Sequence, residues 1–304
     1  MDRRFFLKIA AMAGAAQYGS ASKAFSFAEV TASTGETNPP PPIRFFIIGD
    51  WGTGGKLQRE AASGMARKAT AIQPQFILST GDNIYPKGVD SPDDAQWKTK
   101  FENIYVAEQL QIPWYAVLGN HDYRSNPDAQ IEYGKINQRW NMPARYYSFG
   151  KKEQDCSVEF FAIDTQQILL GKGSEQLKWL EKKLAASKAD WKIGFGHIMI
   201  RSHGYYGDQP FMLKTVKPLF DKYKADAYFC GHDHDLQCIK HPDDNFYQII
   251  SGAGGGTRVS TPGKYSLFAS GNGGFVYCAA TKNSLTVEFL DRNGNLLYTE
   301  IIKK

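Results

Sequence analysis

Short apolar runs alternate with segments of helical periodicity over the first two thirds of the chain. Apolar runs rich in β-branched and aromatic residues predict strands at 43–48, 76–79, 114–118, 158–163, 192–195 and 227–230. Several of these runs lack strict alternation, which is typical of strands buried on both faces of a parallel sheet. Helical periodicity between them predicts helices at 56–72, 129–140, 174–187 and 211–223. The order of elements therefore predicts repeated β–α units.

The last third of the chain carries strand patterns without helices between them. Apolar or alternating runs lie at 247–251, 275–280, 285–290 and 297–302. The turn Arg292-Asn293-Gly294-Asn295 is a hairpin signal, because Asn-Gly favours tight turns between antiparallel strands. Together the two patterns predict an α/β fold, a two-sheet β-sandwich of mixed strands flanked by helices. No internal repeat divides the chain, so we expect one domain at 43–304.

The first 42 residues are expected to lie outside this domain. Residues 1–28 combine Arg3-Arg4, a mildly apolar stretch and the small residues Ser26 and Ala28, which resembles a bacterial twin-arginine signal cleaved after Ala28. Residues 29–42 form a polar, proline-rich linker. These features predict passage through the twin-arginine export machinery to the periplasm or the exterior. The alternative interpretation of residues 1–28 is an amphipathic N-terminal helix.

The net charge and the length of the apolar runs indicate whether the protein binds nucleic acid or membranes. The formal charge of +5 falls to +2 without residues 1–28, because that segment carries four basic residues and one acidic residue. No block of Lys or Arg remains, which argues against binding to nucleic acid or to anionic membranes. No apolar run reaches the roughly 18–20 residues of a membrane span. We therefore expect a mature protein that neither spans a membrane nor binds nucleic acid.

The sequence contains four cysteines, at positions 156, 230, 238 and 278. None forms a Cys-x-x-Cys pair, which argues against a zinc knuckle or a thioredoxin-like motif. Two interpretations stay open. The cysteines form one or two disulfides in an oxidising compartment, or they are buried thiols that pack as small hydrophobic side chains.

Chemically active side chains gather in five short motifs, each opening with glycine at the carboxyl end of a predicted strand. They are Gly49-Asp50-Trp51-Gly52, Gly81-Asp82-Asn83-Ile84-Tyr85, Gly119-Asn120-His121-Asp122, Gly196-His197 and Gly231-His232-Asp233-His234. Most of these motifs, taken alone, are more typical of turns, caps or packed histidines. Together they contain or adjoin five of the six histidines in the chain, all except His241. Because ligands gather at this edge of α/β sheets, the concentration predicts a site for two metal ions.

The ligand types indicate which metals the site would hold. Asp50, Asp82 and the phenol of Tyr85 with one histidine form an oxygen-rich, anionic set that favours iron(III). Asp82, Asn120 and two histidines carry less charge and suit a divalent ion: iron, zinc or manganese. Asp82 is common to both sets and is the expected bridge. The alternative interpretation of Tyr85 is an aromatic core residue beside Pro86.

These motifs resemble those of the metallophosphoesterase superfamily, and more closely its purple acid phosphatases of the small, tartrate-resistant mammalian type. The similarity includes the stretches 112–122, 136–143, 228–237 and 250–254, and it implies the calcineurin-like metallophosphoesterase fold. It also implies a metal-ligand set: Asp50, Tyr85 and His234 for iron(III), Asn120, His197 and His232 for the divalent ion, and Asp82 for both. The histidines that orient the substrate and protonate the leaving oxygen in this family are matched by His121 and His203.

The resemblance implies an enzyme that hydrolyses phosphate monoesters at acid pH. A hydroxide made available by the metal pair would attack phosphorus, and a histidine would act as general acid. Small phosphomonoesters or phosphopeptides are the expected substrates, since few basic residues, chiefly Lys56 and Arg201, lie near the motifs. Residues 254–268 form a shorter loop than the one that overhangs the site in the mammalian enzymes, so we do not expect regulation by cleavage there.

Two other functions stay open. A metallophosphodiesterase or nucleotidase of the wider superfamily would share the motifs but would have no tyrosine ligand, so the role of Tyr85 distinguishes this function from the first. A redox-active di-iron protein is the other alternative, because a pair of iron ions can cycle between oxidation states.

Overall fold

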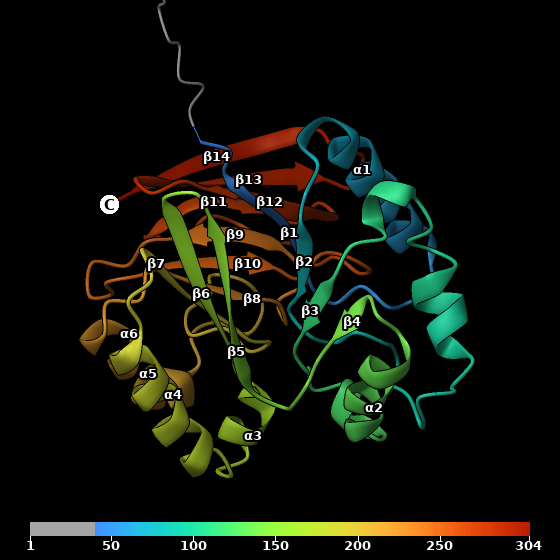
Figure 1. The fold of residues 1–304 in the computed structure, drawn as a ribbon, viewed down its shortest axis with the longest axis horizontal. Helices are drawn as coiled ribbons and strands as arrows, with labels where there is room; N and C mark the ends of the chain where they lie inside the picture. Colours follow the sequence, from blue (N-terminus) through green and yellow to red (C-terminus); the bar gives the residue numbers. More distant parts are fainter. Residues whose placement is uncertain (1–39) are drawn as a thin grey trace, which may run out of the picture. The chain divides into compact units, whose positions relative to one another are not determined.

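The computed structural model describes residues 40–304. The predicted signal segment, residues 1–28, and nearly all of the predicted linker lie outside the described residues. Residues 40–304 form two seven-stranded sheets with helices packed on their outer faces (Figure 1). This arrangement confirms the predicted α/β sandwich of mixed sheets.

The first sheet is parallel at its centre. Its strands lie in the order β14 (Leu296–Lys303), β13 (Ser284–Asp291), β12 (Gly274–Ala280), β1 (Ile43–Ile48), β2 (Phe76–Ser79), β3 (Trp114–Ala116) and β4 (Trp140–Asn141). β1 to β4 run parallel, whereas β12 pairs with β1 in the antiparallel direction. All residues of β1 except Arg44 are buried, because helices cover one face of the sheet and the second sheet covers the other.

The second sheet has the same mixed character. Its strands lie in the order β11 (Ser266–Ser270), β9 (Leu236–Ile239), β10 (Tyr247–Ser251), β8 (Ala227–Cys230), β7 (Trp191–Phe195), β6 (Cys156–Ala162) and β5 (Tyr147–Glu153). β6, β7, β8 and β10 are parallel to their neighbours in this group. The sequence pattern does not predict β4, β5, β9 or β11, because these strands are short or are interrupted by polar residues and glycine.

Helices and single turns connect the strands. The helices are α1 (Lys56–Ile72), α2 (Asp128–Ile136), α3 (Thr165–Leu169), α4 (Ser174–Ala186), α5 (Pro210–Thr215) and α6 (Lys217–Lys222), and the turns are η1 (Lys98–Glu102), η2 (Glu108–Leu110) and η3 (Asp122–Arg124). None of the helices in this part of the chain is long and apolar enough to cross a membrane.

Two helix predictions are wrong in detail. The helix predicted at 129–140 ends at Ile136, because Asn137 is extended and Trp140 pairs with Trp114 in the first sheet. The helix predicted at 211–223 is divided into α5 and α6. Pro218 explains the division, since it has no N–H to continue the hydrogen bonds of α5.

Backbone hydrogen bonds and aromatic contacts join the two sheets. Phe45 of β1 contacts Phe160 of β6 and Phe229 of β8, with ring centroids 5.3 and 6.1 Å apart. Beyond β1, the N–H of Gly49 donates to the carbonyl of Ser251 at 2.7 Å, and the carbonyl of Gly49 accepts the N–H of Gly254 at 3.1 Å. The carboxyl ends of parallel strands from both sheets therefore meet at one edge of the sandwich.

The structure favours the interpretation of the four cysteines as buried thiols. All four are buried and unpaired. Burial raises the pKa of the Cys156 thiol to about 11, and it raises the pKa values of Cys230 and Cys278 well above the ordinary range. Native thiols with such pKa values contain little of the reactive thiolate form at neutral pH.

We expect a reductant to leave the midpoint of thermal unfolding unchanged. A thiol reagent at neutral pH should label the cysteines only after the protein is unfolded in urea, because burial both shields the thiols and raises their pKa. Differential scanning calorimetry with and without dithiothreitol, together with mass spectrometry of the labelled protein, checks both outcomes. A lower unfolding temperature in the reductant would show that a disulfide is present.

Candidate metal centre

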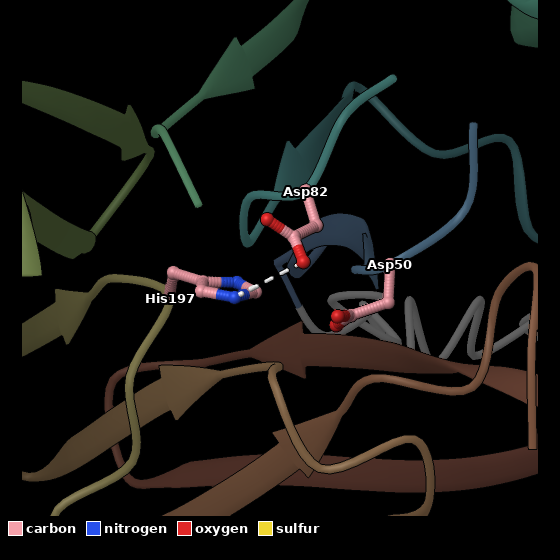
Figure 2. Close-up of side chains that lie close together, drawn as sticks. All are labelled: Asp50, Asp82 and His197. Atoms are coloured by element: carbon pink, nitrogen blue, oxygen red, sulfur yellow. Dashed lines mark ion pairs between the residues drawn. The ribbon is translucent and has the colours of Figure 1, made fainter. Parts of the chain in front are cut away.

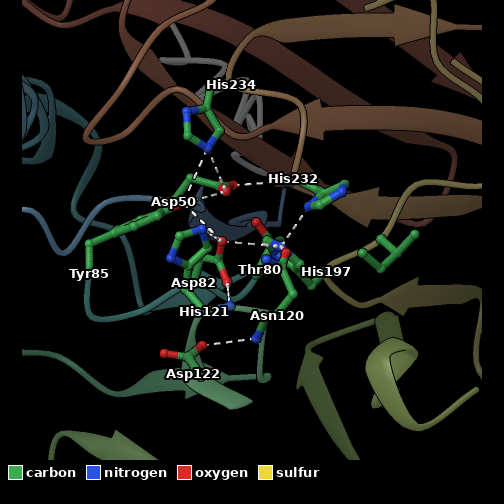
Figure 3. Close-up of polar contacts among 12 residues, drawn as sticks. Asp50, Thr80, Asp82, Tyr85, Asn120, His121, Asp122, His197, His232 and His234 are labelled. Carbon is green, nitrogen blue, oxygen red and sulfur yellow. Dashed lines mark hydrogen bonds and ion pairs between the residues drawn. The ribbon is translucent and has the colours of Figure 1, made fainter. Parts of the chain in front are cut away.

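The predicted ligands come together where the parallel strands of both sheets end. Figure 3 shows Asp50 beyond β1, Asp82 and Tyr85 beyond β2, Asn120 beyond β3, His197 beyond β7, and His232 and His234 beyond β8. Within this group, Asp50, Asp82 and His197 are buried and offer ligand atoms that lie within 4.8 Å of one another (Figure 2).

Three of these residues adopt a left-handed backbone conformation. The φ angle is 56° at Asp50, 50° at Asp82 and 68° at His232. A positive φ is costly for residues other than glycine and persists where the surrounding structure holds it. At each position the chain turns sharply as it leaves its strand, and the turn directs the side chain toward the other ligands. The site therefore contains three of the six non-glycine residues with a positive φ in the described part of the chain.

The first group of donor atoms surrounds the phenol of Tyr85. The Tyr85 hydroxyl lies 2.9 Å from Asp50 Oδ1, 2.9 Å from Asp82 Oδ2 and 3.2 Å from His234 Nε2. Burial raises the pKa of the Tyr85 phenol far above its ordinary value, and the charges of Asp50 and Asp82 raise it further. Without a cation the phenol therefore keeps its proton and donates to the two carboxylates.

The second group of donor atoms surrounds Nε2 of His197. This nitrogen lies 3.1 Å from Asn120 Oδ1, 3.2 Å from His232 Nδ1 and 3.5 Å from Asp82 Oδ2. The other ring nitrogen, Nδ1, lies 3.0 Å from the carbonyl oxygen of Thr80, which accepts its N–H. That hydrogen bond fixes the tautomer and leaves the lone pair of Nε2 directed into the group. Asp82 Oδ2 therefore belongs to both groups of donor atoms.

Each aspartate divides its two oxygens between the backbone and the site. Asp50 Oδ2 accepts the N–H of His232 at 2.9 Å, and Asp82 Oδ1 accepts the N–H of His121 at 2.7 Å. The remaining oxygens, Asp50 Oδ1 and Asp82 Oδ2, face the donor groups. The backbone of a neighbouring loop thus orients each carboxylate before any ion binds.

The chemistry of the donor set fits two cations. Carboxylate, amide and imidazole lone pairs face one another in a buried space, where they repel unless a proton or a metal ion lies between them. Burial opposes the charged form of His197, yet Asp82 and Asp50 outweigh this effect and raise its pKa. The group around Tyr85 is rich in oxygen, which suits iron(III), and the group around His197 contains two imidazoles, which suit a divalent ion.

Comparison with known proteins decides the family. Residues 43–236 match the family described as calcineurin-like phosphoesterase. Tartrate-resistant acid phosphatase type 5 of Mus musculus is 33% identical over 297 residues, which cover 86% of this chain and 90% of the relative. Purple acid phosphatase 4 of Arabidopsis thaliana is 33% identical over 300 residues, which cover 89% of this chain and 86% of the relative. The chain belongs to the purple acid phosphatase family.

Solved structures share the fold of this purple acid phosphatase. GAP50, described as the anchor in the inner membrane complex of Plasmodium, matches with a TM-score of 0.80 and 26% identity over 86% of this chain and 89% of that chain. Purple acid phosphatase PPD1 from yellow lupin (Lupinus luteus) seeds matches with a TM-score of 0.68 and 18% identity over 88% of this chain and 55% of that chain. The second likeness concerns the fold alone.

His121, the first of the two predicted non-ligand histidines, lies at the site. Its Nε2 is 4.0 Å from Asp82 Oδ2, and its ring centroid is 4.4 Å from that of Tyr85. Its Nδ1 lies 2.6 Å from the carbonyl oxygen of Pro86, which accepts a hydrogen bond from the ring. Nε2 is therefore the ring nitrogen that faces the donor groups.

His203, the second predicted non-ligand histidine, lies against the loop that follows β10. Its ring packs against Gly263, where an added Cβ would lie 2.2 Å from His203 Cγ, and its backbone N–H donates to Gln237. Within residues 40–304 no hydrogen bond, ion pair or ring contact joins His203 to the predicted ligands. Tyr206 occupies the position beside the ligands instead, with its ring stacked on His232 at 4.2 Å. Nε2 of His203 is buried without a hydrogen-bond partner in the described part of the chain, and the catalytic role of His203 stays a prediction.

Sequence analysis missed the structural role of Asp122, the last residue of the Gly-Asn-His-Asp motif. Its buried carboxylate accepts the backbone N–H groups of Asn83, Ile84 and Gly119, at 3.1, 3.3 and 2.8 Å, and the side-chain amide of Gln130 at 2.7 Å. Burial, with the charge of Asp82 adding to it, raises the Asp122 pKa to about 7. Asp122 thus ties the loop of Asp82 to the loop of Asn120. The motif itself was the only signal for it.

Replacing Asp122 with alanine should lower the free energy of unfolding by about 3 kcal/mol, because a buried donor left without an acceptor costs roughly 1–3 kcal/mol. Urea unfolding of the metal-free proteins measures the change. Asp128→Ala is the matched control, since that carboxylate is 61% exposed and pairs with Arg145 at the surface. The control should cost about 1 kcal/mol or less. Equal losses in the two variants would contradict the role given to Asp122.

Proposed function

We propose that this purple acid phosphatase hydrolyses phosphate monoesters at acid pH with an iron(III) ion and a divalent ion of iron, zinc or manganese. The position of Tyr85 carries the proposal, because its hydroxyl lies 2.9 Å from oxygens of both Asp50 and Asp82. A phenolate at this point would complete an iron(III) ligand set. The tartrate-resistant and purple acid phosphatases among its relatives support the same reaction.

The ligand assignment follows the two donor groups. Iron(III) would be held by the first group and the divalent ion by the second, with Asp82 shared: Asp50, Tyr85, His234 and Asp82, then Asn120, His197, His232 and Asp82. When bound, two such ions offset the negative charge of a phosphate ester and make hydroxide available below the pKa of free water. Asn120 is neutral, so it leaves the divalent side less negative toward an incoming phosphate.

His121 is the group we propose as general acid. The hydrogen bond from its Nδ1 to Pro86 leaves Nε2 free to carry the proton that the leaving oxygen requires. Its side chain is 22% exposed, so the ring has access to both solvent and substrate. Tyr85 limits the movement of the ring from one side, with the two ring centroids 4.4 Å apart.

We further propose that the natural substrates are small phosphomonoesters or phosphopeptides and that the protein is exported by the twin-arginine machinery to the periplasm or the exterior. Arg3-Arg4 near the N-terminus supports the export route. This route carries folded proteins, so the thiols are buried before the chain leaves the reducing cytoplasm. The four unpaired cysteines agree with folding in that compartment.

The oxidised protein should show a broad purple absorption band and contain iron, because a tyrosinate bound to iron(III) absorbs visible light by charge transfer. Tyr85→Phe should lose the band. Tyr133→Phe is the matched control and should keep the band. It removes a phenol on α2 that donates to Glu102. A visible spectrum with metal analysis on the same sample provides the measurement. A colourless wild-type protein loaded with zinc or manganese would favour the phosphodiesterase or nucleotidase alternative.

Asp82→Asn should abolish both activity and metal retention, since Asp82 Oδ2 belongs to both donor groups.

His121→Ala should lower turnover by roughly 10²–10⁴-fold, as expected for the loss of a general acid, and should keep the colour. Its backbone N–H still donates to Asp82, so the carboxylate stays oriented. Activity assays at acid pH and metal analysis measure the two effects. A colourless His121 variant would contradict this division of roles.

A further inference from the structure

A loop that follows β10 lies against the metal centre. An added Cβ at Gly256 would lie 2.9 Å from Nδ1 of His234, so this part of the loop touches the ring of a proposed iron ligand. Two residues further on, the N–H of Arg258 donates to the carbonyl of His234 at 2.8 Å. The loop therefore places a cationic side chain beside the site, in the segment 254–268.

Aromatic rings hold the guanidinium of Arg258 in place. Its central carbon lies 4.8 Å from the ring centroid of Tyr205 and 4.7 Å from that of Tyr206, and Nη2 donates to the Tyr206 hydroxyl at 3.2 Å. The ring of Tyr206 stacks in turn on His232, with an interplanar angle of 15°. Tyr206 thus connects Arg258 to a proposed ligand of the divalent ion.

The charge of Arg258 reaches the site. Its guanidinium contacts the ring of Tyr206, which is stacked on His232, and its backbone N–H donates to the carbonyl of His234. Arg258 is held by cation–π contacts rather than by an acidic partner, and such contacts leave its positive charge available to an anion.

Arg258 forms no ion pair within the described part of the chain, although its charge acts on the Asp233 carboxylate, and its Nη1 is buried there without a hydrogen-bond partner. Arg201, which the sequence singled out, differs: its guanidinium pairs with Asp244 at 2.6 Å and with Asp208 at 3.0 Å. Buried donors in native proteins nearly always have an acceptor. The unsatisfied Nη1 of Arg258 therefore points to an acceptor that arrives with a ligand.

We propose that Arg258 is a specificity-determining residue that binds a phosphoryl oxygen of the substrate and thereby favours monoesters over diesters. The inference rests on the proposed function. A monoester has one more non-bridging oxygen than a diester. Arginine matches phosphoryl oxygens with its planar fork of donors. An oxygen left over by the metal pair is thus available to Arg258 only in a monoester.

The experiment uses Arg258→Gln with its metals bound and their content measured. The kcat/KM for para-nitrophenyl phosphate should fall about tenfold to a hundredfold, as expected for the loss of a hydrogen bond between charged groups. The kcat/KM for bis(para-nitrophenyl) phosphate should change much less. Calorimetry should show weaker binding of inorganic phosphate by a factor similar to that for the monoester. Arg258→Lys keeps the charge but lacks the planar fork of donors. Its kcat/KM for the monoester should lie between the values of the wild-type protein and Arg258→Gln.

Lys264→Gln is the matched control, because it removes the same charge from an exposed position of the same loop. It should alter neither the monoester-to-diester ratio nor phosphate binding. If Arg258→Gln loses kcat/KM equally on both substrates, or binds inorganic phosphate as tightly as the wild-type protein, the inference is overturned and the role of Arg258 is merely structural. A wild-type protein that hydrolyses no monoester would instead contradict the proposed function.

Discussion

The close approach of two buried carboxylates, those of Asp50 and Asp82, is the constraint on which the rest of the site depends. Negative charges in a low-dielectric interior repel strongly, and burial alone favours their neutral forms. The structure offsets this cost with one backbone N–H for each carboxylate, from His232 and His121. The other oxygens face the phenol of Tyr85, which donates to both of them, and the neighbouring imidazole groups, so cations would bind among these groups.

The same constraint explains why the site lies between the sheets. Asp50 and Asp82 follow strands of the first sheet, whereas His197 and His232 follow strands of the second. The backbone pairing of Gly49 with Ser251 brings the two edges together. Ions bound at this seam would contact loops from both halves of the sandwich, so metal binding would contribute to the stability of the whole fold.

Much of this arrangement could be predicted from the sequence, and the remainder shows where local patterns lose information. Central strands such as β1 are apolar because both faces are covered. The apolar pattern therefore locates these strands, and the motifs come directly after them. The role of His203 could not be fixed from the sequence, because the spacing after β7 does not show which side chain of an irregular loop turns toward the site. Arg258 lies in a glycine-rich loop without periodicity, so only the fold shows that it lies beside His234.

The shared oxygen of Asp82 has a consequence for how the site is filled. Because Oδ2 belongs to both donor groups, the binding of two metal ions would be linked, and each ion would change the affinity for the other by the same factor. The Asp82 carboxylate, already oriented by the N–H of His121, would be available to both ions, while the charges of the two ions would repel each other. The order in which a cell delivers the ions therefore leaves the total free energy of loading unchanged and affects only the rate.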